Sequence, residues 1–443
     1  MKVPVSPPAF RSLFETHLGD LGRLLRLRIG PEVRGKYEHW DHLRYLQAPD
    51  DLSHEQWWLA IKLARDAAAR DLPLLDRDGR PFRVALTDSI ASRLHTITRE
   101  ASGSLRGLDG LADERSRDRY LIRSQIEEAM TSSQLEGAGT TRAVAKDMLR
   151  SGRAPRDRGE RMIHNNYQAM QALKRWRDQP LTPGAVFEIH RLLTVDTLED
   201  ASQAGRLRTE ADNIVVEDEE GRVLHVPPHA DELPARLQAL CDFANGVGEE
   251  GFLHPVVRAI AIHFQIGYDH PFCDGNGRTA RTLFYWSMLR SGYWLTEFLS
   301  VSSVFNRAKA QYLRSYLYTD TDEADLGYFV DHHLDVIVDA IDGLHGWLAR
   351  KADERSRAER LLKPGSKLGS RLNHRQRELL LDAIRHPERS YRIDGHMQAQ
   401  DISYQTARTD LLDLEKAKLL TGQRIGKAFV FTPVADLVER LKK

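Results

Sequence analysis

Residues 270–281 read His-Pro-Phe-Cys-Asp-Gly-Asn-Gly-Arg-Thr-Ala-Arg and lie between two segments with helical periodicity. Gly275 and Gly277 stand where the second helical segment begins. Backbone N–H groups at a helix N-terminus, unhindered by side chains and aided by the helix dipole, form a binding site for a phosphate group. The stretch therefore predicts two helices joined by a loop that binds an anion.

The charged residues of the same stretch extend this prediction. Arg278 and Arg281 are three positions apart on the second helix, so their forked donors would reach two different phosphate groups. Asp274 offers the hard oxygen that a Mg²⁺ ion bridging nucleotide phosphates requires. His270, with an ordinary pKa of about 6.5, would accept a proton from an attacking hydroxyl. Together these residues predict a base, a metal ligand and a phosphate cradle.

Residues 270–281 resemble the motif of the Fic (filamentation-induced-by-cAMP) family, His-Pro-Phe-x-(Asp/Glu)-Gly-Asn-Gly-Arg-x-x-Arg, at every defined position. The segment that starts at His254 is similar to the helix before the Fic loop. The predicted hairpin at 214–226 is similar to the family's flap, which holds a target segment. The resemblance implies a mainly α fold, with a Fic-type helical core and a β-hairpin flap.

The flap residues implied by this resemblance are Ile214, Val215 and Val216. An exposed strand edge offers main-chain hydrogen bonds to an extended peptide, and would align its hydroxyl with the base. The alternative is a hairpin with a purely structural role.

The resemblance also implies an activity, which is transfer of AMP from ATP to a Ser, Thr or Tyr hydroxyl of a protein target or of the chain itself. ATP and Mg²⁺ are the implied cofactors, and pyrophosphate leaves. His270 would deprotonate the hydroxyl and Asp274 would hold Mg²⁺. The implied ATP-binding residues are Gly275, Asn276 and Gly277 around the α-phosphate, Arg278 at the β-phosphate, Arg281 at the γ-phosphate, Tyr312 near adenine, and also Phe272 and Asp274.

Two of these positions carry an alternative. Gly277 stands where a related branch of the family, which phosphorylates its target, has lysine; this favours AMP transfer. Tyr312 lies where the family often has an aromatic residue, but an aromatic side chain at that spacing also serves as a core residue.

A second motif, Ser132-Ser-Gln-Leu-Glu-Gly137, is similar to the family's inhibitory pattern (Ser/Thr)-x-x-x-Glu-(Gly/Asn). The resemblance implies an N-terminal inhibitory helix around 119–137. Glu136 would pair with Arg281 and fill the room that the γ-phosphate requires, while Ser132, one helical turn earlier, would help to fix its position. The alternative is a solvated glutamate at a helix end. Some members with this glutamate also remove AMP, and the sequence leaves that second activity open.

Composition excludes several other classes of protein. The chain has 443 residues, equal numbers of basic and acidic residues (64 each) and 41% apolar residues, as a globular protein does. Its two cysteines cannot build a disulfide framework or a four-thiolate zinc site. The N-terminus lacks the apolar run of a signal peptide, and no window is long and apolar enough to span a membrane. We expect a cytoplasmic protein with no membrane partner.

Changes in composition and pattern predict the domain organisation. We expect an N-terminal helical accessory region at 1–110, a Fic core at 111–349, a polar linker at 350–372 and a winged helix-turn-helix domain at 373–443.

The tail raises the question of a DNA partner. Residues 351–443 hold 20 Lys and Arg against 13 Asp and Glu. Tyr404, Gln405 and Arg408 lie near the N-terminal end of the expected recognition helix, where groove contacts are made. Such domains also bind proteins or dimerise, so a homodimer stays open. Two functions therefore compete: a protein adenylyltransferase autoinhibited by Glu136, or a DNA-binding regulator whose Fic core only senses nucleotide.

Overall fold

The computed structural model describes residues 2–49, 51–102, 114–218, 220–248, 250–366, 368–387, 389–425 and 428–441. These residues form two compact units, divided between Leu344 and His345. Helices dominate, and the described strands form three small antiparallel sheets, so the predicted mainly α fold is confirmed. No helix among these residues is long and apolar enough to cross a membrane. The expected boundary at 110 lies outside the described residues.

The N-terminal region of the larger unit is helical, with one hairpin that the sequence did not predict. Ser53 starts α4 through a capping box with Gln56. The turn at 76–80 joins two antiparallel strands, whose pairing begins with Ala69 opposite Ala85. The elements are α1 (Phe10–Thr16), α2 (Leu21–Arg26), α3 (Trp40–Leu43), α4 (His54–Ala68), β1 (Ala69–Leu75), β2 (Pro81–Ala85) and α5 (Asp88–Ala101).

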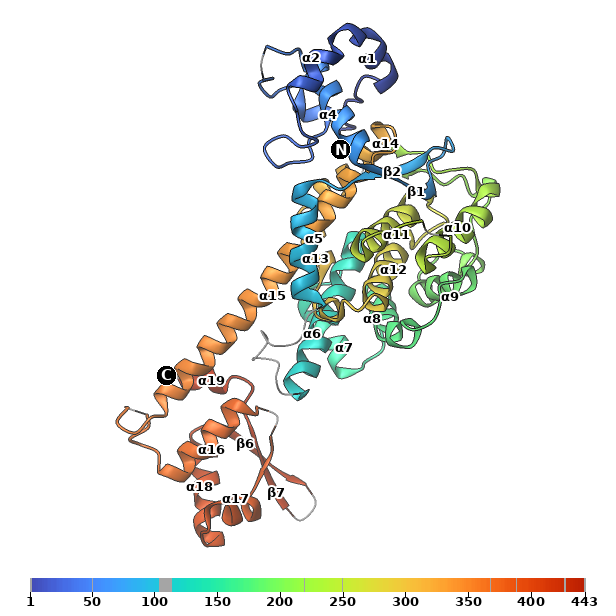
Figure 1. Ribbon diagram of the computed structural model, residues 1–443. Coiled ribbons are helices and arrows are strands. Elements are labelled where there is room, and N and C mark those ends of the chain that lie inside the picture. Colours follow the sequence, from blue (N-terminus) through green and yellow to red (C-terminus); the bar gives the residue numbers. More distant parts are fainter. Residues whose placement is uncertain are drawn as a thin grey trace. The chain divides into compact units, whose positions relative to one another are not determined.

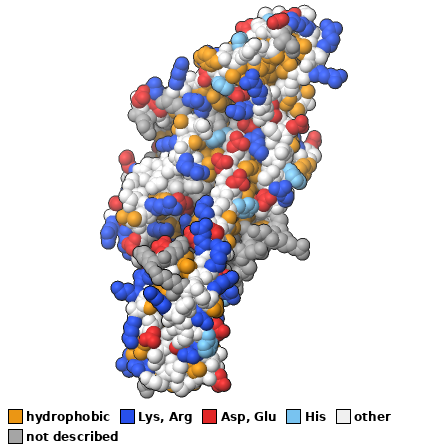
Figure 2. Space-filling model, turned by 90° about the vertical axis from the view of Figure 1, so that its left-hand side faces the viewer, with side chains coloured by type: hydrophobic (Ala, Val, Ile, Leu, Met, Phe, Trp, Pro, Cys, Tyr) orange, Lys and Arg blue, Asp and Glu red, His pale blue; other side chains and the backbone are white. Residues whose placement is uncertain are grey.

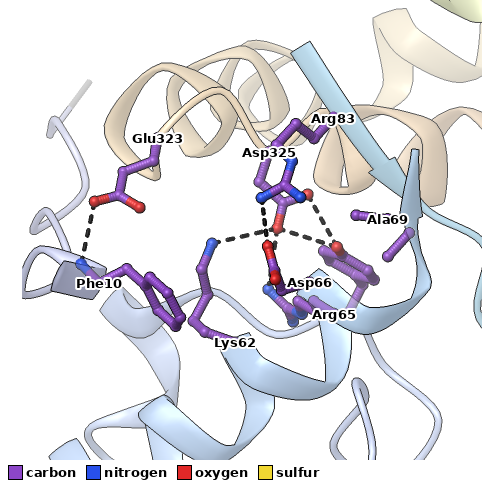
Figure 3. A pocket seen from close by; sticks show the side chains of 10 residues that line it. Phe10, Lys62, Arg65, Asp66, Ala69, Arg83, Glu323 and Asp325 are labelled. Atoms are coloured by element: carbon purple, nitrogen blue, oxygen red, sulfur yellow. Dashed lines mark hydrogen bonds and ion pairs between the residues drawn. The ribbon is translucent and has the colours of Figure 1, made fainter. Parts of the chain in front are cut away.

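Buried charges attach this region to the rest of the larger unit. Figure 3 shows Lys62 and Arg65 of α4 pointing toward Asp325, at 3.7 and 3.6 Å. Lys62 also pairs with Asp322 at 3.0 Å, and the Tyr37 hydroxyl donates to Asp325 at 2.9 Å. Removing one partner of a buried ion pair costs about 3–5 kcal/mol. The N-terminal region is therefore firmly held against the segment before α15 (Gly327–Leu361).

Two helices at the centre of the larger unit carry the motif between them. They are α11 (Pro255–Asp269) and α12 (Asn276–Arg290), which lie side by side in Figure 1 and whose side chains are almost all buried. Burial on nearly every face explains the many apolar residues of α11 and of the second half of α12, while the first half of α12 buries the polar motif residues. The helices around them are α6 (Glu114–Leu135), α7 (Arg142–Ser151), α8 (Arg158–Trp176), α9 (Pro183–Thr194), α10 (Leu233–Asn245), α13 (Val301–Arg307) and α14 (Lys309–Thr321).

The predicted hairpin is present but shorter than expected. Its strands are β3 (Val216–Glu217) and β4 (Val223–His225), with Val216 opposite His225. Ile214 and Val215 precede the first strand, so the expectation that they belong to it is wrong. His225 fixes the hairpin, because its Nε2 donates to the Tyr268 carbonyl at 2.8 Å.

The expected linker begins too early. α15 continues without a break to Leu361, although the composition turns polar near 350. The physical reason is that Ala358 and Leu362 pack into the core of the smaller unit, so this polar segment still has one buried side.

The smaller unit has its own apolar core, which includes Leu380, Leu411 and Phe431. The pattern of residues 373–443 predicts helix, helix, then hairpin; these elements are present, and the sequence missed a further helix, α17, between the two helices. The elements are α16 (His374–Arg385), β5 (Tyr391–Arg392), α17 (Ile393–Gln400), α18 (Tyr404–Lys416), β6 (Leu420–Ile425), β7 (Ala428–Pro433) and α19 (Leu437–Arg440), with the strands ordered β5-β7-β6.

Candidate active site

The loop between α11 and α12 is held by two residues in the left-handed region. His270 ends α11 with φ 45° and ψ 55°, and Gly275 precedes α12 with φ 83°. A β-carbon on Gly275 would lie 2.9 Å from Thr194 Cγ2, so only glycine fits. For histidine this conformation is strained and persists only where the surroundings enforce it. The backbone thus holds the imidazole in one direction.

His270 is a neutral imidazole with a defined tautomer. Its Nδ1 lies 3.3 Å from the Gly267 carbonyl, which can only accept, so Nδ1 carries the proton and Nε2 keeps its lone pair. Burial lowers the pKa of His270 to about 4. The side chain is therefore available as a base at neutral pH.

One cavity of about 190 Å³ brings together residues that the sequence predicted from four separate segments. Its wall combines the end of α6, the flap, α11, α12 and α14, and the sequence-predicted residues in it are Glu136, Val216, His270, Gly277 and Tyr312. Tyr316, Leu313 and Leu317 add an apolar face.

Tyr312 is oriented by two buried histidines that the sequence did not mark as functional. The His333 Nδ1 lies 2.9 Å from the Phe329 carbonyl and must donate to it, so His333 Nε2 accepts from His263 Nδ1 at 3.2 Å. His263 Nε2 then accepts from the Tyr312 hydroxyl at 2.9 Å. The hydroxyl proton of Tyr312 therefore points toward His263. Toward other groups, the Tyr312 oxygen can act only as a hydrogen-bond acceptor.

The N-terminus of α12 offers hydrogen-bond donors. The backbone N–H groups of Asn276, Gly277 and Arg278 make no hydrogen bond to another described residue, as expected for the first turn of a helix. The Gly275 N–H differs, because it bonds to the Asp274 carboxylate. The helix start is thus prepared for an anion mainly through Gly277 and its neighbours.

The side chains of Asn276 and Phe272, two of the expected ATP-binding residues, lie inside the loop. The Asn276 side chain accepts from the Phe272 N–H at 2.9 Å and donates to the Phe272 carbonyl at 2.7 Å. Phe272 is fully buried and stacks on His190 with ring centroids 3.8 Å apart. Both side chains brace the loop from inside.

His190 is a loop support that sequence reasoning missed. Its Nδ1 accepts from the Gly205 N–H at 2.9 Å, so its Nε2 donates to the Asp274 carbonyl at 2.8 Å. Burial lowers the pKa of His190 to about 4, which keeps the ring neutral and this pattern intact. Its position on α9, far from the motif, gave no signal in the sequence.

Arg278 is a buried cation with incomplete pairing. Its side chain is 0% exposed, and Nη1 donates to the Leu193 carbonyl at 2.8 Å. Its Nε and Nη2 have no hydrogen-bond partner among the described residues, and the Asp274 carboxylate lies 3.5 Å from Nη2. Burial lowers the pKa of Arg278. Unsatisfied buried donors cost free energy, and an anionic ligand would satisfy them.

Arg281, one turn later, is bound by residues at the end of α6 and just after it. Its Nη2 donates to Glu136 Oε1 at 2.8 Å and to the Ser132 carbonyl at 2.9 Å, and its Nε donates to Ser132 Oγ at 2.8 Å. Burial alone would lower the pKa of Arg281, but Glu136 raises it above its ordinary value. Ser132 thus holds the arginine, whereas we expected it to position the glutamate.

Two glycines determine the position of Glu136: Gly137, which follows it in the chain, and Gly277, which lies against its carboxylate. Gly137, with φ 90°, ends the helix, and the Ala138 N–H turns back to the Ser133 carbonyl at 3.0 Å. A β-carbon on Gly277 would lie 2.1 Å from Glu136 Oε1. The carboxylate therefore rests directly against the first turn of α12.

Asp274 lies at the solvent edge of the site. Its side chain is 36% exposed and pairs with Arg158 of α8 at 3.0 Å, a contact that the sequence did not predict. The described residues contain no group of three or more His, Cys, Asp and Glu side chains that would hold a metal by themselves. A cation here would need ligand oxygens from a bound molecule.

Comparison with known proteins agrees with this geometry. Residues 180–288 match the model of the Fic/DOC family. The protein adenylyltransferase Fic of Nematostella vectensis is 33% identical over 117 residues, which are 26% of this chain and 25% of that protein. The chain therefore spans about a quarter of this relative's length.

Solved structures show the same fold at low identity. A Fic family protein from Desulfovibrio desulfuricans G20 has a TM-score of 0.50 and 20% identity, covering 78% of this chain and 95% of its own. Fic-1 of C. elegans has a TM-score of 0.50 and 17% identity, covering 79% of this chain and 90% of its own.

Proposed function

We propose that this protein, whose residues 180–288 form a Fic domain, is an autoinhibited protein adenylyltransferase. Its relative from Nematostella vectensis is named a protein adenylyltransferase. The observation that carries the proposal is Arg278, a buried guanidinium with unpartnered donors beside a helix N-terminus and a neutral histidine. This combination fits a nucleotide phosphate next to a general base.

The proposed reaction transfers AMP from ATP to a Ser, Thr or Tyr hydroxyl. The hydroxyl oxygen attacks the α-phosphorus, the bond from that phosphorus to the bridging oxygen toward the β-phosphate breaks, and pyrophosphate leaves. The hydroxyl proton passes to His270 Nε2, whose lone pair is left free by the Nδ1–H bond to the Gly267 carbonyl. The N–H groups of Gly277 and its neighbours stabilise charge on the α-phosphate, and Arg278 binds the β-phosphate.

Mg²⁺ fits the donor set as a shared ligand of protein and nucleotide. Asp274 is a partly exposed carboxylate beside the phosphate cradle, and Mg²⁺ commonly takes one protein carboxylate together with phosphate oxygens. Bound there, the ion would neutralise charge on the phosphates. Arg158 would give up its ion pair with Asp274 when that happens.

Autoinhibition follows from the position of Glu136. Its carboxylate accepts a hydrogen bond from the guanidinium of Arg281. Without Glu136, that guanidinium would bind the γ-phosphate. A triphosphate would place negative charge against that carboxylate, so ATP would bind in an unproductive position until Glu136 moves. Since Glu136 also lines the cavity, it would orient water if the enzyme removes AMP; loss of label from modified protein after ATP is removed would test that activity.

The flap would hold the target segment beside the cavity. Val216 and Leu224 line the cavity, whereas Val215 and Val223 are 39% and 48% exposed. This division leaves an apolar outer surface for a peptide that pairs with the hairpin.

The position of the retained label tests the proposal. The full-length Glu136→Gly variant is incubated with Mg²⁺ and with ATP labelled at either the α- or the γ-phosphate, alone and with cell lysate. Adenylyl transfer leaves the α label on protein and releases the γ label. Retention of the γ label, or of neither, would contradict it.

A second candidate function concerns the smaller unit. Its order of helices and strands supports the winged-helix assignment, and the exposed side chains of Tyr404, Gln405 and Arg408 make no side-chain interaction with other described residues. Figure 2 shows Lys and Arg side chains over this part of the chain, at the bottom of the view. We propose that this face binds the DNA backbone and groove.

DNA binding has a direct test with a matched control. Arg408→Ala should weaken a salt-sensitive gel shift of duplex DNA by the full-length protein. Arg389→Ala is the control, since Arg389 is already paired with Asp382 at 3.0 Å. Equal effects of the two substitutions, or no gel shift at low salt, would rule out DNA binding.

Two free cysteines, Cys241 and Cys273, are consistent with the expected cytoplasmic location.

A further inference from the structure

Arg208 is a buried arginine whose hydrogen bonds all reach backbone carbonyl groups. Its residue is 5% exposed, and it precedes the flap in the chain. Its Nε donates to the His270 carbonyl at 2.8 Å, and its Nη2 donates to the carbonyls of Pro228 and Asp269 at 2.6 and 3.3 Å. Its own N–H donates to the Pro271 carbonyl at 2.9 Å.

Three of these acceptors belong to the turn that carries the base. Asp269 is the last residue of α11, and His270 is its left-handed cap. Carbonyl groups at a helix C-terminus lack intrahelical partners and attract a cation. The Arg208 guanidinium therefore satisfies the end of α11, and it donates to the carbonyls of Asp269 and His270, which belong to the two peptide units on either side of the strained His270 Cα.

The fourth acceptor lies just after the flap in the chain. Pro228 lies three residues after the end of β4, so one guanidinium connects the base of the flap to the turn of the general base. Arginine suits this position because its planar fork donates in several fixed directions, whereas lysine is a point charge on a flexible stem.

We propose that Arg208 is a positioning residue that sets His270 and the target-binding flap in register for the transfer step. The proposal rests on the proposed function, but it makes a separate structural claim. None of the hydrogen bonds of Arg208 reaches the N-terminus of α12 or Arg278. The affinity for nucleotide should therefore be nearly independent of Arg208.

The test uses the full chain in the Glu136→Gly background, with Arg208→Ala, Arg208→Lys and the control Arg206→Ala. Arg206 lies two residues earlier and bonds to Asp212 and Leu207, not to the turn or the flap. We expect both Arg208 variants to lower the rate of self-labelling from α-labelled ATP at least tenfold, while the dissociation constant for ATP changes less than threefold. Arg206→Ala should leave both quantities unchanged.

Hydrogen exchange separates positioning from general damage. In Arg208→Lys, amide exchange should accelerate in both 224–230 and 268–272, and it should stay as in the parent elsewhere in the larger unit. Acceleration in one segment only, equal effects in Arg206→Ala, or loss of ATP binding as large as the loss of rate would overturn the proposal. If the Glu136→Gly parent transfers no label, the proposed function fails, and the exchange result still decides the role of Arg208.

Discussion

Arg278 and Arg281 lie three residues apart on one helix, yet their surroundings differ. Glu136 and Ser132 satisfy Arg281, whereas two donor nitrogens of Arg278 have no hydrogen-bond partner among the described residues. A nucleotide can therefore approach the Arg278 end of the cradle while the Arg281 end is blocked. Under the proposed function, this asymmetry is the residue-level reason why the protein would bind nucleotide and still be inactive.

Because the hydrogen bonds of Arg278 are incomplete, we predict that replacing it changes stability and nucleotide binding in opposite directions. Arg278→Met should leave the free energy of unfolding of the nucleotide-free protein unchanged or raise it by about 2 kcal/mol, because a buried, poorly satisfied cation is replaced by an apolar side chain. The same variant should lose the rise in melting temperature that ATP produces in the parent.

Calorimetry with and without ATP measures both effects. Arg290→Met is the control, since Arg290 lies at the exposed end of the same helix and donates to the Gln179 carbonyl. A large loss of stability in Arg278→Met, or continued stabilisation by ATP, would show that the arginine is structural.

At the scale of elements, α6, the helix that we propose to be inhibitory, is attached through a buried carboxylate. Glu128, two turns before Glu136 on α6, accepts from Ser300 Oγ at 2.9 Å and from the Ser302 N–H at 3.1 Å. The exposed fraction of Glu128 is 1%, and burial raises its pKa although the Ser302 bonds oppose that shift. The start of α13 thus fixes the position of α6.

Loss of this attachment should loosen inhibition. Glu128→Ala removes an acceptor from buried donors, so we expect the free energy of unfolding to fall by about 2–3 kcal/mol and basal self-labelling to rise. The neighbouring Glu127→Ala is the control, because Glu127 forms a surface pair with Arg142. Urea unfolding and label incorporation measure the two effects. If Glu128→Ala lowers the free energy of unfolding but leaves basal self-labelling unchanged, the attachment of α6 to α13 has no part in inhibition.

The sequence predicted elements well where a local pattern coincides with burial. The helical pattern of the sequence predicts helices over 255–268 and 277–291, and α11 and α12 differ from these ranges by one residue at one or both ends, because both are closely packed helices with a cap or glycine at the boundary. The continuation of α15 to Leu361 was missed, since only its contact with a second core stabilises a polar segment. His190, Arg158 and Arg208 were missed as site residues for a similar reason: each reaches the loop from a distant segment.

At the scale of the whole molecule, buried histidines make stability depend on pH. Burial lowers the pKa of His39 and of His190 to about 4. In the unfolded chain each titrates at about 6.5. Between these values the unfolded state binds protons that the native state does not, so stability falls as pH drops from 6.5 and the loss is complete below about 4.

The expected loss is at most about 3 kcal/mol for each of these histidines. Urea midpoints at pH 7.5 and pH 5 should differ in the parent, with lower stability at pH 5. His39→Gln keeps a polar side chain in place and should reduce that difference. A pH dependence that is absent, or reversed in sign, would contradict the neutral assignment of these rings.

The central claim is that residues 270–281 transfer AMP with His270 as the base and that Glu136 holds the reaction back. The most direct measurement is the initial rate of incorporation from α-labelled ATP into the wild-type protein, Glu136→Gly and Glu136→Gly/His270→Ala, each confirmed to be folded. We predict a rate at least tenfold above wild type in the single variant and no incorporation in the double variant. Equal rates in wild type and Glu136→Gly, or label retained without His270, would contradict the account.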